Sequence, residues 1–333
     1  MCGASYLLQS LSWASAYRSI DKLLNHPADT RPDIMRFAKE LEKIASQIPR
    51  GRVTTYGQVA KALGDVKAAK AVFGVISRSR QTHRIVNAEG KVSEWQIRLL
   101  RDEGIEVGDS VRDMKAHLFT DFRTDFPLKA LREEQEWIAE KVVAEDDFED
   151  VELVCGFDLA YDDSEAICAY VVVETGNLEV VEKGTIRMEI DFPYIPGYLA
   201  YREFPAIECA HRELESMVDV LLVDGHGIMH PRKAGIACHV GVKLDVPTIG
   251  VGKSPLVGRV EVPPEPGSCE RVLDGDEMVG HALRWPTSKK PIFVSPGHKV
   301  SFNTAAKLVR RLMKSRIPEP LRLAHELATA RRG

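Results

Sequence analysis

Three acidic residues of this chain lie in or beside apolar sequence, where an ionised carboxylate is costly. Asp158 falls inside the strand-like run "CGFDLAY", Asp224 ends the apolar run "DVLLVD", and Glu203 comes just ahead of a predicted helix. A buried carboxylate is stable only when another charge or a metal ion compensates it. Neighbouring strands of one sheet would bring Asp158 and Asp224 side by side, which predicts a shared site.

A cluster of carboxylates repels itself unless a divalent cation neutralises it. Oxygen ligands of this kind favour Mg²⁺, with Mn²⁺ as a substitute, over zinc. Mg²⁺ held by two or three carboxylates suits phosphodiester hydrolysis, because the metal activates water and stabilises the leaving oxygen. Taken singly, each acid is better explained as a structural residue. The agreement of the three contexts is what favours a metal site.

Further polar residues follow predicted strands. His226 and His230 come after Asp224, Lys253 lies in "GVGKSP", and His298 lies in "SPGHKV". We expect these strand ends to meet at one edge of the sheet, where sites of α/β proteins tend to lie. Zinc binding by the two histidines of the HxxxH spacing is an alternative, but this loop is rich in glycine and is not helical, which disfavours it.

The stretch "FPYIPGYLAYRE" predicts a stiff loop. Pro193 and Pro196 bracket Tyr194 and Ile195, and prolines restrict the backbone. A stiff loop that presents an aromatic and an apolar side chain can act as a wedge between stacked bases. The alternative is a hydrophobic loop that packs on its own domain.

The elements that position these residues alternate between strand and helix. We predict strands at 152–161, 165–174, 181–190, 218–227, 246–253 and 290–300, and helices at 204–217, 232–244 and 301–315. Three antiparallel strands followed by strand–helix–strand units predict a mixed sheet with helices on both faces. The fold class is therefore α/β.

These motifs occur in the order and spacing of endonuclease V over roughly residues 128–316, and this part of the chain resembles that family. The resemblance implies an RNase H-like fold and nicking of nucleic acid at deaminated bases, chiefly hypoxanthine, at the second phosphodiester 3′ to the lesion. It implies that Asp158, Glu203 and Asp224 hold Mg²⁺ and that His298 supports the metal site. His230 and Lys253 would lie near the scissile phosphate, and the wedge would be the loop Pro193, Tyr194, Ile195 and Pro196.

The N-terminal part of the chain shows a different pattern. A helix over 33–48 would place Phe37, Leu41, Ile44 and Ile48 on one face, and Thr55 is a plausible N-cap of the next helix. The run "TYGQVAKALGDVKAAKAVFGVIS" then predicts helix, short turn and helix, a helix-turn-helix arrangement. Small helical domains of this winged type bind DNA, although the pattern alone is common.

Charge is distributed unevenly along the chain. The net charge is −4, but residues 1–126 hold 20 Lys and Arg against 15 Asp and Glu, and residues 50–101 hold 11 against 3. A local excess of this size favours a polyanion such as a nucleic-acid backbone as partner. A solvated basic face is the alternative.

Residues 34–121 resemble the C-terminal DNA-binding domain of O6-alkylguanine-DNA alkyltransferases, through "IPRGRVTTYGQVAKALG", "AAKAVFGVIS" and "THRIVNAEGKV". The family's acceptor cysteine corresponds to Thr82, whose hydroxyl is too weakly acidic for alkyl transfer. Tyr56, Lys70 and Arg84 match residues of the family's DNA-binding surface. His83 and Arg84 also suit a structural hydrogen-bonding role. The resemblance implies a non-catalytic, alkyltransferase-like DNA-binding module, with a spacer as the alternative.

Composition sets the remaining expectations. No apolar run approaches the roughly 20 residues of a membrane span, the start lacks a signal-peptide pattern, and the six cysteines include no CxxC pair. We expect a cytoplasmic protein with reduced thiols and no membrane partner. The predicted domains are a helical extension (1–30), the alkyltransferase-like domain (31–123), the nuclease domain (127–318) and a tail (319–333).

The predicted function is a DNA-repair endonuclease that acts at deoxyinosine. Two alternatives stay open. One is a lesion-binding sensor without nuclease activity, and the other is a ribonuclease specific for inosine-containing RNA. The sequence leaves the oligomeric state open.

Overall fold

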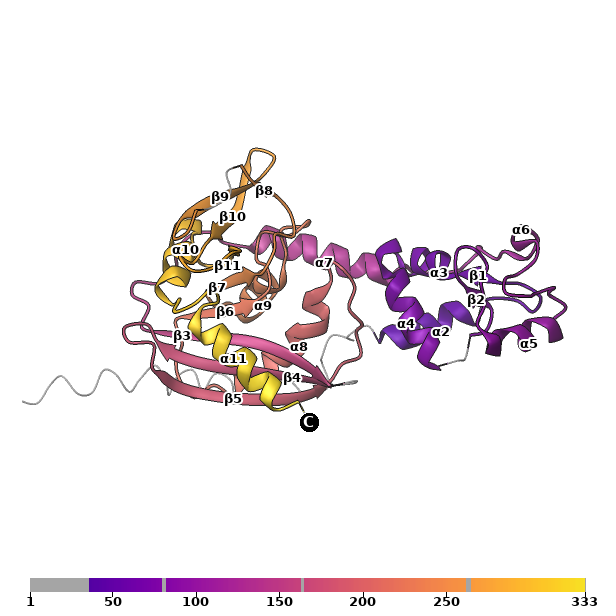
Figure 1. Cartoon of the computed structure of the whole chain (residues 1–333), viewed down its shortest axis with the longest axis horizontal. Helices are drawn as coiled ribbons and strands as arrows, with labels where there is room; N and C mark the ends of the chain where they lie inside the picture. The colour runs from indigo at the N-terminus through magenta and orange to yellow at the C-terminus, as the bar shows by residue number, and fades with distance from the viewer. Residues whose placement is uncertain (1–35, 80–81, 163–164, 262–264, 333) are drawn as a thin grey trace, which may run out of the picture. The chain divides into compact units, whose positions relative to one another are not determined.

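A computed structural model describes residues 36–79, 82–162, 165–261 and 265–332 (Figure 1). The extension predicted at residues 1–30 lies outside this range. No helix in the described part of the chain is long and apolar enough to cross a membrane. Each described cysteine is free, and Cys155, Cys168 and Cys238 are buried.

The N-terminal group of elements is helical. Its members are α2 (Phe37–Ala45), β1 (Thr54–Thr55), α3 (Tyr56–Leu63), the 3₁₀ helix η1 (Val66–Ala68), α4 (Ala69–Ser79), β2 (Ile85–Val86), α5 (Glu94–Asp102) and α6 (Met114–His117). Thr55 caps α3 as predicted, and its hydroxyl accepts a hydrogen bond from the Gln58 N–H at 3.2 Å. Gly64, with φ of 108°, ends α3 and turns the chain toward α4.

The predicted apolar face of α2 is confirmed, because Phe37, Leu41, Ile44 and Ile48 are all buried. On α4 the side chains of Val72 and Ile76 are buried, as is Ala68 of η1. Their spacing of four residues is that of one helix face. Both helices of the predicted helix-turn-helix are therefore packed on one side and open on the other.

The C-terminal group forms an α/β domain. Its elements are α7 (Pro127–Lys141), β3 (Leu153–Asp162), β4 (Glu165–Glu174), β5 (Val180–Glu189), α8 (Leu199–Arg212), β6 (Val220–Asp224), α9 (Ile236–Leu244), β7 (Thr248–Gly252), β8 (Arg259–Val260), β9 (Cys269–Asp274), β10 (Glu277–Leu283), β11 (Ile292–His298), α10 (Phe302–Arg311) and α11 (Glu319–Ala330). Within the described residues one nine-stranded sheet has the order β5-β4-β3-β6-β7-β11-β10-β9-β8. β3, β6 and β7 are parallel, whereas β4 and β11 run antiparallel to their neighbours β3 and β7. The predicted mixed α/β sheet is confirmed.

Strand residues alternate between two cores, one on each face of the sheet. Val220 and Leu222 of β6 pack in a core with α10 and α11, whereas Leu221 and Val223 pack in a core with α8 and α9. This two-residue period is that of a strand buried on both sides. The sheet is thus a rigid platform whose strand ends can hold functional side chains.

Three predictions about element limits need correction. Helix α8 begins at Leu199, so Glu203 lies inside the helix rather than ahead of it, and Pro205 is an internal helix residue rather than the start. The strands β8, β9 and β10 were not predicted; β8 has only two residues, and β9 is mostly exposed or half-buried. The predicted tail at 319–333 contains α11, whose Leu321, Ala324 and Ala328 join the nuclease-domain core.

Candidate functional site

Asp158 and Asp224 are neighbours, as predicted from their strands. β3 and β6 are parallel, and Phe157 pairs with Val223, so the next residue of each strand is one of the two acids. Asp158 is 5% exposed, and burial followed by the negative charge of Asp224 raises its pKa to about 6. A hydrogen bond between the two carboxyl groups contributes to the same shift. Asp158 therefore keeps its proton to a higher pH than an ordinary aspartate does.

Glu203 reaches this pair from α8. The Tyr161 hydroxyl of β3 donates a hydrogen bond of 2.6 Å to Glu203 Oε1. Burial raises the pKa of Glu203 to about 7, helped by the charges of Asp224 and Asp158 and opposed by the Tyr161 hydrogen bond. The three predicted acids therefore interact with one another electrostatically.

Lys253 is the cation nearest this group that the sequence predicted. Its Nζ lies 2.8 Å from Asp224 Oδ2, just beyond the end of β7. Burial opposes the charge on the ammonium, but the hydrogen bond and charge of Asp224 outweigh it and raise the pKa of Lys253. Lys253 thus stays positive beside the acids.

His325 of α11 is a site residue that the sequence reasoning missed. Its Nδ1 lies 2.7 Å from Asp158 Oδ2, while its side chain is 61% exposed. The run "RLAHELA" has a helical pattern in which Leu321, Ala324 and Ala328 face the core. That pattern marks an amphipathic helix, but it contains no signal that places the histidine beside Asp158, since the two residues are 167 positions apart.

His298 lies at the end of the sheet where β7 begins, away from the acids. The prediction that it lies beside them is therefore wrong. β11 is antiparallel to β7, so His298 pairs with Thr248 at the start of β7, whereas Lys253 follows the end of β7. The Val143 N–H donates to His298 Nδ1 at 3.2 Å, and Nε2 lies 3.6 Å from Asp245. The prediction that these strand ends meet required β11 to run parallel to β7, and it runs antiparallel.

His230 lies beside Gly197, the residue that follows the predicted wedge loop, and its place near the scissile phosphate stays a prediction. Its Nδ1 accepts a hydrogen bond from the Arg232 N–H at 3.2 Å, and burial followed by the charge of Arg232 lowers its pKa to about 3. Gln135 donates to the Gly197 carbonyl at 3.0 Å and accepts from Arg232 Nε at 2.7 Å. These contacts hold Gly197, the residue that follows the loop.

The loop itself presents a single large side chain. Tyr194 is 62% exposed, whereas Ile195 is fully buried. Pro193 is half-buried and Pro196 is exposed. Of the two side chains expected to act as a wedge, only the Tyr194 ring is available to a partner, and Ile195 anchors the loop.

The donor set fits a divalent cation in its chemistry. Carboxylate oxygens from Asp158, Asp224 and Glu203 are the ligands that Mg²⁺ prefers. Within residues 36–79, 82–162, 165–261 and 265–332, no group of three or more His, Cys, Asp or Glu side chains is arranged so that it could hold a metal ion. A cation here would lie beside Asp158 and Glu203, whose pKa values are raised by burial and by the neighbouring negative charges.

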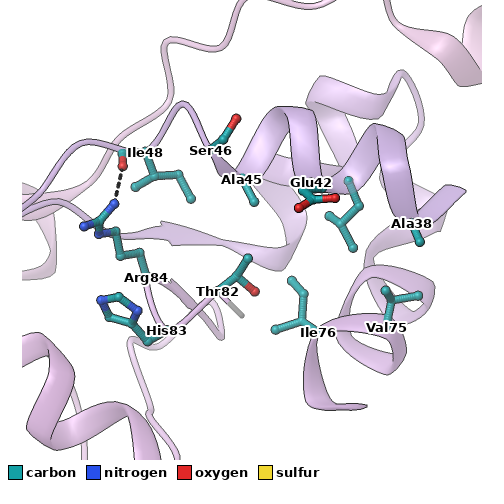
Figure 2. A pocket seen from close by; sticks show the side chains of 11 residues that line it. Ala38, Glu42, Ala45, Ser46, Ile48, Val75, Ile76, Thr82, His83 and Arg84 are labelled. Atoms are coloured by element: carbon teal, nitrogen blue, oxygen red, sulfur yellow. Dashed lines mark hydrogen bonds between the residues drawn. The ribbon is translucent and has the colours of Figure 1, made fainter. Parts of the chain in front are cut away.

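A second candidate site surrounds Thr82 in the N-terminal domain. A cavity of about 300 Å³ is lined by side chains of α2 and α4 together with Thr82, His83 and Arg84 (Figure 2). Its walls include the apolar residues Leu41, Ala45, Ile48, Val75 and Ile76. The Thr82 hydroxyl is buried, and it has no hydrogen-bond partner among the residues that the structure describes.

Beside this cavity, Glu103 ties together the residues that follow Thr82. It accepts hydrogen bonds from Arg84 at 2.6 Å and from the Gly51 N–H at 3.0 Å, and it lies 2.8 Å from His83 Nε2. Burial opposes its ionisation, but these hydrogen bonds lower its pKa to about 2. Arg84 also donates to the Ile48 carbonyl at 2.8 Å. Arg84 thus has a structural role, and its predicted DNA contact stays a prediction.

The other two residues predicted to contact DNA are placed differently. Lys70 is exposed on α4, and Tyr56 is half-buried at the start of α3. The Tyr56 ring meets the Phe73 ring edge to face at 5.3 Å. Both therefore lie on elements of the helix-turn-helix that can reach a partner.

Family models match both parts of the chain. The model described as Endonuclease V matches residues 136–326, and the model described as 6-O-methylguanine DNA methyltransferase, DNA binding domain, matches residues 36–105. A bifunctional methyltransferase/endonuclease from Picrophilus torridus is 38% identical over 304 residues, which cover 88% of this chain and 95% of the relative. An endonuclease V from Thermofilum pendens is 46% identical over 209 residues, covering 62% and 89%.

Solved structures agree for the C-terminal domain. Endonuclease V from Streptomyces avermitilis has a TM-score of 0.57 and 37% identity, covering 61% of this chain and 91% of its own. Endonuclease V from Ciona intestinalis, in complex with a 24mer DNA containing an inosine followed by a ribo-adenosine, has a TM-score of 0.56 and 30% identity, covering 62% and 98%. This chain belongs to the endonuclease V family and carries an alkyltransferase-type DNA-binding domain ahead of its nuclease domain.

Proposed function

We propose that this protein is a DNA-repair endonuclease that nicks DNA at deoxyinosine, at the second phosphodiester 3′ to the lesion, by metal-dependent hydrolysis. The observation that carries the proposal is the pair Asp158 and Asp224, held side by side on parallel strands with Glu203 within electrostatic reach. Burial and the neighbouring negative charges raise the pKa values of Asp158 and Glu203, and a divalent cation would offset both effects.

Each neighbouring side chain has a defined part in this proposal. Mg²⁺, or Mn²⁺ in its place, would be held by Asp158, Glu203 and Asp224 and would supply an activated water and charge stabilisation at the leaving oxygen. His325 orients Asp158, and Tyr161 orients Glu203, through the hydrogen bonds described above. Lys253 brings a positive charge that suits the scissile phosphate.

The remaining parts of the molecule position the substrate. The loop that ends at Gly197 offers Tyr194 as an aromatic wedge for separating the strand at the lesion. The helix-turn-helix domain supplies the basic surface for duplex DNA, and its tether raises the concentration of the nuclease near bound DNA. Thr82 replaces the acceptor cysteine, so this domain binds and does not transfer alkyl groups.

A labelled duplex with one deoxyinosine, beside an undamaged duplex, tests the proposal in Mg²⁺ and in EDTA. We expect one nick beyond the inosine, only in the damaged strand and only with the metal. Tight binding without a nick under Mg²⁺ or Mn²⁺ would establish the sensor alternative instead.

The structure of the Ciona relative contains a DNA strand in which a ribo-adenosine follows the inosine. The ribonuclease alternative is therefore tested in a separate experiment. The same strand is therefore tested as DNA, as RNA and as DNA with one ribonucleotide after the inosine. Cleavage confined to strands that contain ribose would replace DNA by RNA as the substrate.

A further inference from the structure

The open face of the helix-turn-helix carries an aromatic side chain that the core does not use. Phe73 of α4 is 50% exposed, and Val66, at the start of η1, is 56% exposed. Val66, Lys70, Phe73 and Ser77 follow one another at four, three and four residues, the spacing of one helix face, and all four are exposed. Exposed apolar groups gathered on one face mark an interaction surface.

The packing of α4 explains why this face is free. Val72 and Ile76 bury a neighbouring face of the helix, while Phe73 stays half exposed. Phe73 therefore contributes little to the core, and the ring contact at 5.3 Å to Tyr56 is what fixes its direction. At the next position, Gly74 has no atom within 4 Å of where a Cβ would stand. Phe73 thus presents a half-exposed ring that Tyr56 supports edge to face.

Charge identifies the partner that this face suits. Lys67 and Lys70 are exposed beside Phe73, within the segment 50–101 that holds 11 basic against 3 acidic residues. A surface that combines basic side chains with a projecting aromatic ring matches a duplex, because lysine meets the phosphates and the ring can enter between base pairs. Stacking of a base on an aromatic ring is sequence-tolerant, since every base has a π-face.

We propose that Phe73, braced by Tyr56, is inserted between base steps of duplex DNA when the N-terminal domain binds. The inference rests on the proposed DNA binding by this domain and adds the side chain that unstacks the duplex there. The protein would then have two aromatic wedges, Phe73 in the helix-turn-helix domain and Tyr194 in the nuclease domain.

The test uses the full chain in EDTA, which leaves binding without cleavage, and an undamaged duplex with one 2-aminopurine. Fluorescence anisotropy gives the affinity, and 2-aminopurine fluorescence reports unstacking. All proteins carry Tyr194→Ala, which removes the second wedge. We expect Phe73→Ser to weaken binding about tenfold and to abolish the fluorescence rise. Phe73→Trp should retain both signals, and Leu99→Ser, at an apolar residue 40% exposed on α5, should change neither.

A salt titration separates this inference from the function on which it rests. Lys67→Ala with Lys70→Ala should lower the slope of log affinity against log salt by about two, whereas Phe73→Ser should leave the slope unchanged. If Phe73→Ser binds and unstacks DNA as the parent does while the lysine pair matters, insertion is wrong and DNA binding stands. If neither change matters, DNA binding by this domain is wrong as well.

Discussion

The two polar clusters of this protein contain the same kinds of side chain but opposite electrostatics. Around Asp158 the acids outnumber the cations that touch them, and pKa values are raised. Around Glu103 a single acid is met by Arg84, His83 and a backbone N–H, and its pKa falls to about 2. One cluster holds repulsion that a ligand can relieve, and the other is already satisfied.

The comparison separates a site for chemistry from a site for structure. A carboxylate whose charge is already compensated stabilises the fold and does not bind a cation. Crowded carboxylates destabilise the metal-free fold, but they can bind a cation. The Thr82 hydroxyl lies next to the satisfied cluster, so this part of the N-terminal domain has neither a nucleophile nor a strained acid. The following predictions test that contrast, from the largest expected effect to the smallest.

Removal of one crowded acid should have the largest effect. Asp224→Ala is expected to reduce nicking about a thousandfold, because a lost metal ligand removes about 4 kcal/mol of transition-state stabilisation. Single-turnover rates on the deoxyinosine duplex measure this effect. Asp276→Ala, at an exposed acid between β9 and β10, is the control and should cut at the parental rate. Retained nicking by Asp224→Ala would refute the site.

Breaking the satisfied cluster should harm folding instead. Glu103→Gln is expected to lower the free energy of unfolding by about 3 kcal/mol, because it leaves the Arg84 guanidinium without its buried partner. The pKa of Glu103 lies below its usual value, so its contribution is present above about pH 4.5 and is lost as the pH falls toward 2. Urea denaturation at pH 7 and pH 3 checks both statements. An unchanged midpoint at pH 7 would show that the cluster is not structural.

His325 tests whether α11 belongs to the active site. His325→Ala is expected to slow nicking about 10- to 100-fold, the usual effect of losing a side chain that orients a metal ligand. The Mg²⁺ concentration that gives a half-maximal nicking rate should be higher for His325→Ala than for the parent protein. His325→Gln keeps a hydrogen-bond donor and should recover part of the loss. Equal rates for all three proteins would reduce the contact with Asp158 to a surface ion pair.

Asp158→Asn should shift stability in the opposite direction from Glu103→Gln. In EDTA at pH 7.5 it is expected to raise the free energy of unfolding by on the order of 1–2 kcal/mol, because it removes repulsion with Asp224. The folded pKa of about 6 lies above the usual value of 3.8, so the folded state binds this proton more tightly. Its contribution is therefore full below about pH 4 and is lost as the pH rises through 6.

Chemical denaturation of the parent and Asp158→Asn across pH 4 to 8 measures this difference. The two curves should converge at low pH, where the parental carboxyl is protonated, and separate as the pH rises. A gap that is the same at every pH would mean that the substitution acts through packing rather than charge.

The sequence predicted those parts of the site that depend on local pattern. Asp158 lies within an apolar strand and Asp224 ends one. The pairing of these two strands was enough to predict that the two acids are neighbours. His325 did not, because its contact depends on how a C-terminal helix crosses the sheet. The position of His298 was predicted wrongly, because the sequence of its strand does not show in which direction the strand runs. Only the antiparallel pairing of β11 with β7 shows at which end of the strands His298 lies. Local sequence thus predicts elements, and their direction in the sheet decides the site.

The smallest effect is expected at Thr82, which lies beside the compensated cluster around Glu103. Thr82→Val replaces a buried hydroxyl, unpaired within the described residues, by a methyl group of similar shape. It should raise the free energy of unfolding by about 0.5–1 kcal/mol, since an unmade hydrogen bond is removed. Thermal unfolding and binding to duplexes with and without O6-methylguanine measure the outcome. Higher stability with unchanged binding identifies an idle position, whereas lower affinity for the alkylated duplex alone would show that the lesion engages this hydroxyl.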